Sequence, residues 1–186
     1  MEQIELIDPW VSSDYHLLKE LKYGNKDLQR TNDIIAMHNK FVKPNDVFLF
    51  LGDISESEFF DQDKERIMNE LIKYCNRLNG IKILLTGNND TIDIDVYKQM
   101  GFKEIYTEAV VTQNYIFSHH PVPTANKLNL HGHIHGTKEY WNMNAEKHID
   151  VYFGLYGQPV KLSYLNKYYL DGKYQGVSKV VNEKEV

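Results

Sequence analysis

Apolar residues in the first half of the chain alternate between short runs and longer stretches with helical spacing. Val47–Leu51 and Ile81–Leu85 are short, largely apolar runs, and each is followed within two residues by glycine. Such runs are typical of strands buried on both faces of a layered α/β fold. Residues 28–42 and 62–78 carry apolar positions at helical spacing, which predicts two amphipathic helices. Trp10–Ser12 is predicted to be a further short strand.

The second half of the chain has a different pattern. Asp90 or Thr91 is expected to cap a short helix that ends near Met100. After Gly101 the sequence predicts strands at Glu108–Thr112, Tyr115–Ser118, Lys127–Leu130 and Ile149–Phe153. Strand–helix units followed by a strand-rich half suggest two stacked sheets with helices outside them.

The amino-acid composition and the net charge limit the classes of protein to which this chain can belong. Of the 186 residues, 42% are hydrophobic and 25% are charged, as in an ordinary folded domain. No linker or internal repeat is visible, so we expect a single domain over residues 1–186, with a flexible polar tail at 172–186. The formal net charge of -5 argues against a surface that grips long nucleic acid. Bound cations could still make one cleft locally positive for a short nucleotide.

The chain shows no sign of export or membrane insertion. Its single cysteine, Cys75, cannot form an intramolecular disulfide and is expected to be a buried helix residue. The acidic start, Met1–Glu5, lacks the apolar run of a signal peptide, and no stretch approaches a membrane-spanning length. We therefore expect a cytoplasmic protein with no membrane partner.

Potential metal ligands recur directly after the predicted strands. They are Asp14, His16, Asp53, Asn88, His119, His120, His131, His133 and His135. Side chains at the ends of several strands can converge in one cleft. Two ligands separated by one residue, as in Asp14–His16 and His133–His135, point to the same side of an extended backbone. Carboxylate, amide and imidazole ligands together suit Mn²⁺, Fe or Zn²⁺.

Each of these motifs is weak when it is taken singly. A lone Gly–Asp is usually a turn, and a lone histidine is more often packed or exposed than a ligand. His38 lies on a predicted helix beside apolar neighbours, so we interpret it as a packed residue and not as a ligand. Several ligand motifs in order, each after a strand, nevertheless favour a metal site.

The sequence resembles the calcineurin-like metallophosphoesterase superfamily. That family's pattern is Asp-x-His, Gly-Asp, Gly-Asn-His-Asp/Glu, a later His, and Gly-His-x-His. It is matched in order by residues 14–16, 52–53, 87–90, 118–121 and 131–135. The match covers most of the chain and is closest to the small cap-less bacterial and phage group. The resemblance implies an α/β fold, a four-layer αββα sandwich of two mixed sheets flanked by helices.

The resemblance also implies a binuclear centre. One ion would be held by Asp14, His16 and His135, and the other by Asn88, His119 and His133, with Asp53 bridging both. The expected cofactors are two divalent ions, with Mn²⁺ first and Fe, Zn²⁺ or Ni²⁺ as alternatives. Two cations about 3.5–4 Å apart can generate a bridging hydroxide, which would attack phosphorus in line. Asp90 or Asp150 is expected to accept a hydrogen bond from a ring nitrogen that is not on metal.

One position departs from the family pattern. Asn89 stands where the family usually has a histidine that contacts the phosphate or protonates the leaving group. Asparagine can donate a hydrogen bond to a phosphate oxygen, but it cannot act as a general acid. His120 is the nearest candidate in sequence to replace that histidine, although on extended backbone it should point away from His119. The catalytic candidates are therefore Asn89, Asp53 and His120.

The sequence leaves more than one function open. The chain has little room for a cap domain, so we expect hydrolysis of a small phosphate ester, such as a nucleotide derivative, with a diester favoured over a monoester. The alternative is a metal-binding protein-interaction scaffold on the same fold, which the asparagine at position 89 favours. A nuclease is a third possibility, disfavoured by the acidic charge. The sequence names no protein partner.

Overall fold

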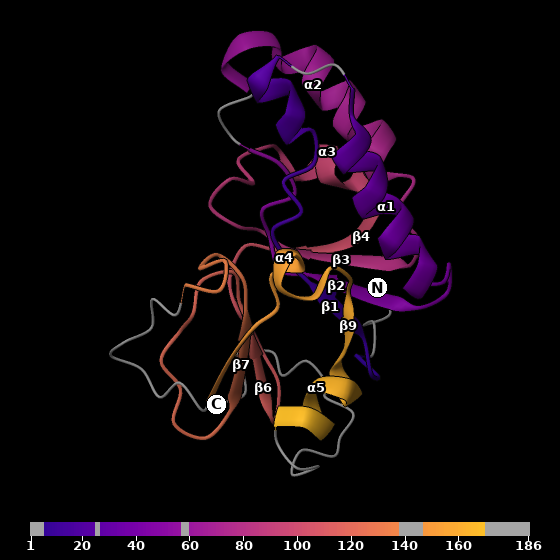
Figure 1. Cartoon of the computed structure of the whole chain (residues 1–186). Coiled ribbons are helices and arrows are strands. Elements are labelled where there is room, and N and C mark those ends of the chain that lie inside the picture. Colours follow the sequence, from indigo (N-terminus) through magenta and orange to yellow (C-terminus); the bar gives the residue numbers. More distant parts are fainter. Residues whose placement is uncertain (1–5, 25–26, 57–59, 138–146, 170–186) are drawn as a thin grey trace.

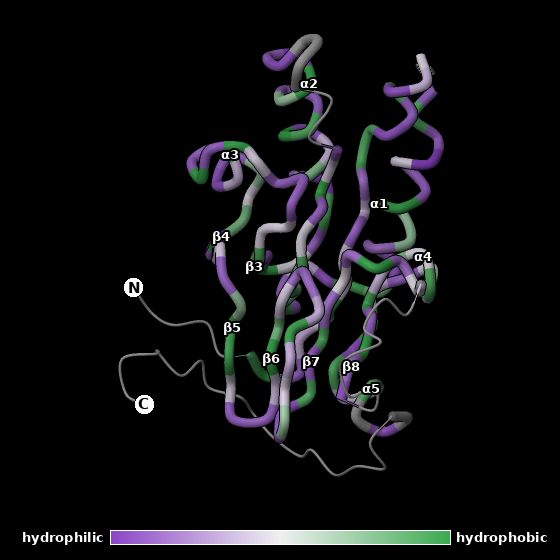
Figure 2. The backbone as a smooth tube through the Cα atoms, turned by 90° about the vertical axis from the view of Figure 1, so that its left-hand side faces the viewer, coloured by the Kyte–Doolittle hydropathy of each residue, from purple (hydrophilic) through white to green (hydrophobic). Residues whose placement is uncertain are grey.

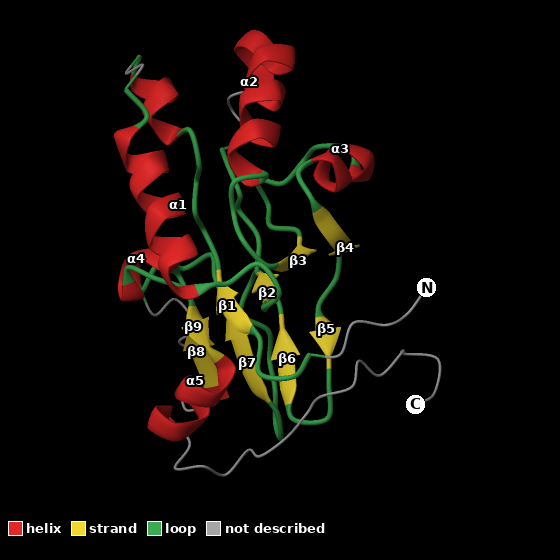
Figure 3. Ribbon diagram, turned by 90° about the vertical axis from the view of Figure 1, so that its right-hand side faces the viewer, coloured by secondary structure: helices red, strands yellow, loops and turns green. Residues whose placement is uncertain are grey.

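The computed structural model describes residues 6–24, 27–56, 60–137 and 147–169 (Figure 1). The predicted polar tail at 172–186 lies outside these residues. The described chain forms two β-sheets that pack against each other, with a layer of helices on one side (Figures 1 and 3).

The first sheet has the strand order β4-β3-β2-β1-β9. Strands β1 (Trp10–Ser12), β2 (Val47–Phe50), β3 (Ile81–Leu85) and β4 (Phe102–Tyr106) are parallel, and β9 (Val160–Lys161) is antiparallel to β1. The predicted strands that correspond to β1, β2 and β3 are confirmed. Strand β4 was not predicted, because it lies at the sheet edge and Phe102 is its single fully buried residue.

The second sheet has the strand order β5-β6-β7-β8. Strand β5 (Val110–Val111) is antiparallel to β6 (Tyr115–Phe117), which is followed by the parallel strands β7 (Leu128–His131) and β8 (His148–Asp150). The strands predicted from residue 108 to residue 130 are confirmed with small shifts at their ends. The strand predicted at 149–153 ends early, because the chain turns into a short helix at Phe153.

The helical elements are η1 (Lys19–Tyr23), α1 (Gln29–Phe41), α2 (Phe60–Cys75), α3 (Ile94–Gln99), α4 (Phe153–Tyr156) and α5 (Leu162–Tyr169). Helices α1, α2 and α3 cover the outer face of the first sheet, whereas α5 lies on its other side and packs into the core shared with the second sheet (Figure 1). Hydrophilic and hydrophobic residues alternate along α1 and α2, as predicted for amphipathic helices (Figure 2). The prediction that Asp90 or Thr91 caps α3 is wrong, because its N-cap residue is Asp93.

Alternation along β2 separates two hydrophobic cores. Phe48 and Phe50 face the helices and belong to the core that includes Leu71 of α2. Leu49 faces the second sheet and belongs to the core that includes Phe117 of β6. Successive side chains of a strand point to opposite faces, so one strand can serve both cores. The predicted α/β fold of two mixed sheets with flanking helices is confirmed.

The segments that follow the strands meet where the two sheets join. The backbone N–H of Asp14 donates to the carbonyl of Gly52 at 2.9 Å, which ties the segment after β1 to the segment after β2. Ser13 forms an isolated parallel bridge with Tyr152, which ties the first sheet to the chain after β8. The predicted ligands from both halves of the chain are therefore brought to one place.

Candidate metal centre

The predicted ligands are presented by unusual backbone conformations. Positive φ angles occur at Asp14 (56°), His16 (43°), Asp53 (58°), His133 (69°) and His135 (46°). Residues other than glycine rarely adopt such angles, and they cluster at functional sites. The ligand pairs therefore converge through turns, and the sequence argument from extended backbone described their local geometry wrongly.

Two glycines allow the loops after β2 and β3 to approach closely. Gly52 has a φ of 88°, and a Cβ atom on it would lie 2.5 Å from the backbone nitrogen of Gly87. A Cβ atom on Gly87 would collide with the carboxylate of Asp53. A side chain at either position would push these loops apart, so both glycines are needed to bring Asp53 beside Asn88.

The first group of ligands comprises Asp14, His16 and His135, whose candidate ligand atoms lie within 4.8 Å of one another. Nε2 of His135 is 3.2 Å from Oδ1 of Asp14 and 3.3 Å from Nε2 of His16. Asp14 is fully buried and also accepts the backbone N–H of His133 at 3.1 Å. The three side chains thus face a common point from the segments after β1 and β7.

Opposing effects act on the charge of Asp14. Burial alone would raise its pKa, but the contact with His135 holds that pKa below its usual range. The same contact raises the pKa of His135. Burial and neighbouring imidazoles lower the pKa of His133 and of His120. A buried carboxylate that stays ionised beside imidazoles is the arrangement that a divalent cation requires.

The second group is built around His119. Its Nε2 atom lies 3.0 Å from Oδ1 of Asn88 and 3.5 Å from Oδ1 of Asp53. The centroid of its ring is 5.1 Å from that of His133. Asp53 lies between the two groups, because its Oδ2 atom is 4.0 Å from Nε2 of His16. The carboxylate of Asp53 therefore lies within 4.0 Å of a histidine from each group.

The hydrogen bonding of His119 tests whether these residues fit a cation. Its Nδ1 atom is 2.7 Å from the carbonyl oxygen of Leu51, so Nδ1 must carry the hydrogen and donate it. When the ring carries this single hydrogen, its Nε2 atom is an acceptor that faces two further acceptors, the oxygens of Asn88 and Asp53. A bound cation would satisfy all three at once, so the donor set fits a divalent metal.

Asp90 and Asp150 do not have the predicted role. The carboxylate of Asp90 accepts backbone N–H groups from Asp53 at 2.7 Å, Ile54 at 3.0 Å and Gly87 at 2.8 Å. It therefore cross-links the loops after β2 and β3, and burial raises its pKa to about 6. Asp150, at the end of β8, similarly accepts the backbone N–H groups of Gly136 at 2.7 Å and of Tyr152 at 2.9 Å. Backbone donors therefore occupy both carboxylates.

Asn89 contacts the carboxylate of Asp53. Its side-chain amide donates to Oδ2 of Asp53 at 2.7 Å, and its backbone N–H donates to Oδ1 at 3.0 Å. The residue at the departure from the family pattern therefore holds Asp53 in place in this structure.

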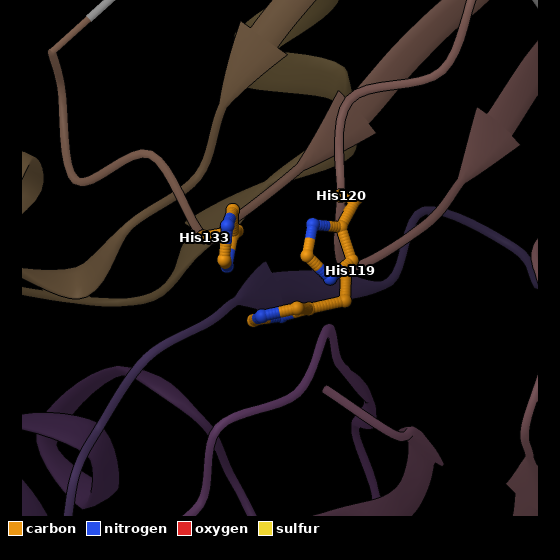
Figure 4. A group of neighbouring side chains, drawn as sticks. All are labelled: His119, His120 and His133. Carbon is orange, nitrogen blue, oxygen red and sulfur yellow. The ribbon is translucent and has the colours of Figure 1, made fainter. Parts of the chain in front are cut away.

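His120 turns into the site. Its ring centroid is 3.9 Å from that of His133 and 5.0 Å from that of His119, and the three imidazoles face one another (Figure 4). The prediction that His120 points away from His119 is wrong, because the backbone bends there. Ser118 Oγ donates to the carbonyl of His120 at 2.6 Å, and the buried Asn129 holds Ser118 in turn.

The floor and the rim of the site differ in exposure. Asp14, Asp53 and His119 are buried, whereas His120 and His135 are exposed. The candidate ligands thus form a buried polar floor with an exposed rim.

Glu56 was missed by the sequence argument. Its Oε1 atom is 3.2 Å from Nδ1 of His16 and 3.0 Å from Nζ of Lys19. Arg30 was also missed, and its guanidinium donates to the carbonyls of Tyr15 and His16 at 2.9 and 2.8 Å. No local motif marks these residues, because their roles depend on contacts formed only in the folded loops.

Comparison with known proteins agrees with this geometry. A family model described as calcineurin-like phosphoesterase matches residues 9–172. The chain belongs to the calcineurin-like phosphoesterase family. This family and the ligand groups of the site support a metal-dependent phosphoesterase that binds divalent ions. In the part of the chain that the structure describes, no helix is long and apolar enough to cross a membrane.

One solved structure supports the fold of this calcineurin-like phosphoesterase. A crystal structure of a protein of unknown function, AQ665 from Aquifex aeolicus, is similar with a TM-score of 0.61 and 22% identity, covering 86% of this chain and 98% of that one. The Pseudomonas putida nuclease MPE is similar with a TM-score of 0.48 and 21% identity, covering 67% of this chain and 60% of that one. No curated protein matches the chain. At these identities the structural likeness concerns the fold alone.

Proposed function

We propose that this protein is a binuclear metal-dependent phosphodiesterase that acts on a small phosphate ester. The proposal rests on one observation: Nε2 of His119 lies 3.0 Å from an oxygen of Asn88 and 3.5 Å from an oxygen of Asp53. A divalent cation bound between these atoms would satisfy all of them at once. A second cluster of the same kind, which includes Asp14, lies on the other side of Asp53.

Each ion would have its own ligands. One would be held by Asp14, His16 and His135 and the other by Asn88, His119 and His133, with Asp53 shared. When bound, the two ions would activate a water molecule for attack on phosphorus and offset the charge that develops on the phosphate. Mn²⁺ is the first metal to test, with Fe, Zn²⁺ and Ni²⁺ as alternatives, because the ligands mix oxygen with imidazole nitrogen.

The substrate we propose is a small diester, for example one derived from a nucleotide. The exposed side of the site admits such a molecule, and the formal net charge of -5 argues against long nucleic acid. We propose the cytoplasm as the place of action, without a membrane partner.

Asn89 and His120 share the work of the family's usual histidine in this proposal. Asn89 fixes the carboxylate of Asp53 through two hydrogen bonds. His120 is exposed at the rim, beside His133. From there its ring can donate a hydrogen bond to a phosphate or leaving-group oxygen.

Removing the metal should abolish activity. We expect about two equivalents of divalent metal per chain by elemental analysis, and turnover of bis-p-nitrophenyl phosphate that EDTA eliminates and Mn²⁺ restores. Slower turnover of p-nitrophenyl phosphate would support the preference for diesters. Equal or faster turnover of the monoester would contradict that preference.

The same measurement separates the enzyme from the alternative, a metal-binding interaction scaffold. The asparagine at position 89 favours that alternative, since it removes a general acid. Two bound ions with no turnover of either ester would support the scaffold. Failure to bind metal under any loading condition would contradict both functions.

His120→Gln should slow hydrolysis of poor leaving groups selectively. We expect kcat for a phenyl diester to fall by about 10²-fold, the lower end of the usual contribution of a general acid, while bis-p-nitrophenyl phosphate changes little. Adding Asn89→His in the same variant should restore part of the loss. Measuring kcat across diesters with leaving groups of different pKa checks this, and an equal loss for all of them would contradict a leaving-group role.

A further inference from the structure

A cavity of about 390 Å³ lies beside the first group of ligands, between α1 and the start of α4, two helices that are side by side in Figure 3. Residues of both helices and of the metal site line it, among them Asp14, Arg30, Asp33, Met37, Tyr152 and Phe153. Asp14 is fully buried and therefore marks the inner end of the cavity. Cavities that bind small molecules usually measure about 300–1,000 Å³, so this one has room for a ring-sized group.

One wall of the cavity is joined to the metal site through Tyr152. Its ring stacks on that of the candidate ligand His135, with the centroids 4.4 Å apart and the planes at 17°. A Cβ atom on Gly154 would collide with the ring of Tyr152, so the glycine leaves room for the ring to lie there. The same aromatic side chain thus borders the cavity and contacts a ligand of the first group.

The opposite wall is joined to the metal site through Arg30. Its guanidinium donates to the carbonyl oxygens of Tyr15 at 2.9 Å and of His16 at 2.8 Å, in the segment that presents the first group of ligands. Both walls are therefore attached to segments that carry ligands. A group bound in the cavity would be held at a fixed distance from the first metal position.

The lining favours a flat, uncharged ring as the occupant. Tyr152 and Phe153 offer aromatic surface and Met37 offers a thioether, and both kinds of side chain pack well against another aromatic ring. The charged groups of the lining include two carboxylates, of Asp14 and Asp33, and the guanidinium of Arg30. Two carboxylates beside one cation disfavour a second anionic group of the substrate, such as another phosphate.

We propose that this cavity binds an uncharged aromatic ring carried by the substrate, and that Met37 and Tyr152 help to set the preference for such esters. The inference deepens the proposed function, on which it rests for the phosphate position at the metal site. An aryl ester and a nucleotide both carry a suitable ring. The experiment below distinguishes these two sources.

Met37→Trp is the variant that should fill the cavity, because Met37 is 37% exposed and a larger side chain there can be accommodated without entering the core. Ala36→Trp is the matched control. It adds the same side chain at an exposed neighbouring position on α1, which the lining of the cavity does not include. Both variants are made in the full chain.

The first readout is competitive inhibition of bis-p-nitrophenyl phosphate turnover in the presence of Mn²⁺. The inhibitors are methylphosphonate, phenylphosphonate and thymidine 5′-phosphate, each of which carries one organic group. We expect a ring-bearing inhibitor to bind the wild type about 10-fold more tightly than methylphosphonate. Met37→Trp should abolish this preference, and Ala36→Trp should keep it. A gain for phenylphosphonate would indicate an aryl group, and a gain for thymidine 5′-phosphate alone would indicate a nucleoside.

The second readout needs neither metal nor turnover. Methionine methyl groups are labelled with ¹³C in the metal-free protein, and Met37→Leu identifies the NMR signal of Met37. Benzyl alcohol and thymidine serve as uncharged ring-bearing probes, and methanol serves as the control. We expect at least one ring-bearing probe to shift the Met37 signal, because an aromatic ring changes the magnetic field at a methyl group that it contacts, and we expect no shift with methanol.

Three results would overturn the inference. They are equal inhibition by all three compounds, a preference for rings that survives Met37→Trp, and a Met37 signal that neither ring-bearing probe shifts. If the wild type turned over no phosphate ester, the proposed function would fail. The NMR titration would then still decide whether the cavity binds an aromatic ring.

Discussion

Asp53→Asn should lower phosphoesterase activity by about 10³-fold or more and prevent the binding of two ions per chain. Its Oδ2 atom lies 4.0 Å from Nε2 of His16 and its Oδ1 atom lies 3.5 Å from Nε2 of His119, so one carboxylate faces both metal positions. Asparagine has nearly the same shape but lacks the charge. The loss should therefore come from metal binding and from the stabilisation of charge in the transition state.

Three measurements check this expectation, namely metal content, kcat/KM on bis-p-nitrophenyl phosphate and the melting temperature without metal. Asp95→Asn is the matched control, since Asp95 is an exposed carboxylate on α3 that pairs with Lys98 at 2.9 Å. The melting temperature separates loss of metal binding from loss of the fold, because Asn89 donates to both oxygens of Asp53 and asparagine at position 53 keeps one of these two acceptors. Full activity with two bound ions would show that Asp53 does not bridge.

His38→Gln should make the stability of the protein less sensitive to acid, by about 3 kcal/mol between pH 7 and pH 4. Burial lowers the pKa of His38 from 6.5 to about 4. Its Nδ1 atom accepts the hydroxyl of Tyr15 at 2.8 Å while Nε2 donates to the carbonyl of Asn79 at 2.9 Å, an arrangement that requires the neutral ring. The folded state therefore resists protonation of His38.

The sign of this pH effect follows from which state of the protein, folded or unfolded, protonates His38 at the higher pH. Above pH 6.5 the ring is neutral in the folded and unfolded states, so the full stability is present. As the pH falls below 6.5, the unfolded chain takes up a proton that the folded chain excludes, and stability is lost down to about pH 4. Glutamine at position 38 does not titrate. The variant should be the less stable protein at pH 7, but its deficit should shrink at pH 4.

Denaturant unfolding of the metal-free proteins at pH 7 and pH 4 measures this difference. The comparison with wild type matters, because other buried groups also titrate in this range, including Asp90, whose pKa is raised to about 6. Met37→Gln, a change at a partly exposed neighbour on α1, should have the same effect at both pH values. A deficit of His38→Gln that is equal at the two pH values would show that His38 is not held neutral.

The fold was predicted where burial leaves a clear pattern in the sequence. Val47–Leu51 and Ile81–Leu85 lie inside the first sheet, between helices and the second sheet, so nearly every position is apolar. Strand β4 lies at the edge of the sheet, and its residues are mostly half-buried. Its pattern is correspondingly weak, which explains why it was missed.

The sequence predicted which residues form the site better than it predicted how their side chains are oriented. The sequence argument placed His120 away from His119 because it assumed extended backbone. In the structure the chain bends after Ser118, and Asn129 on β7 holds the bend through its hydrogen bonds to Ser118 and Val122. Such a turn depends on a partner eleven residues later in the chain than Ser118, so the local pattern does not reveal it.

The sequence by itself determined the family and the set of candidate ligands. Metal ligands must be particular residue types, and short loops after strands keep them in short motifs, which remain visible without a structure. The tertiary structure decided what those side chains contact. It alone showed that Asp90 ties two loops together, that Asn89 holds Asp53 and that Glu56 reaches His16. These contacts join loops from different strands, and their partners are set by how the two sheets and their connecting turns pack in space.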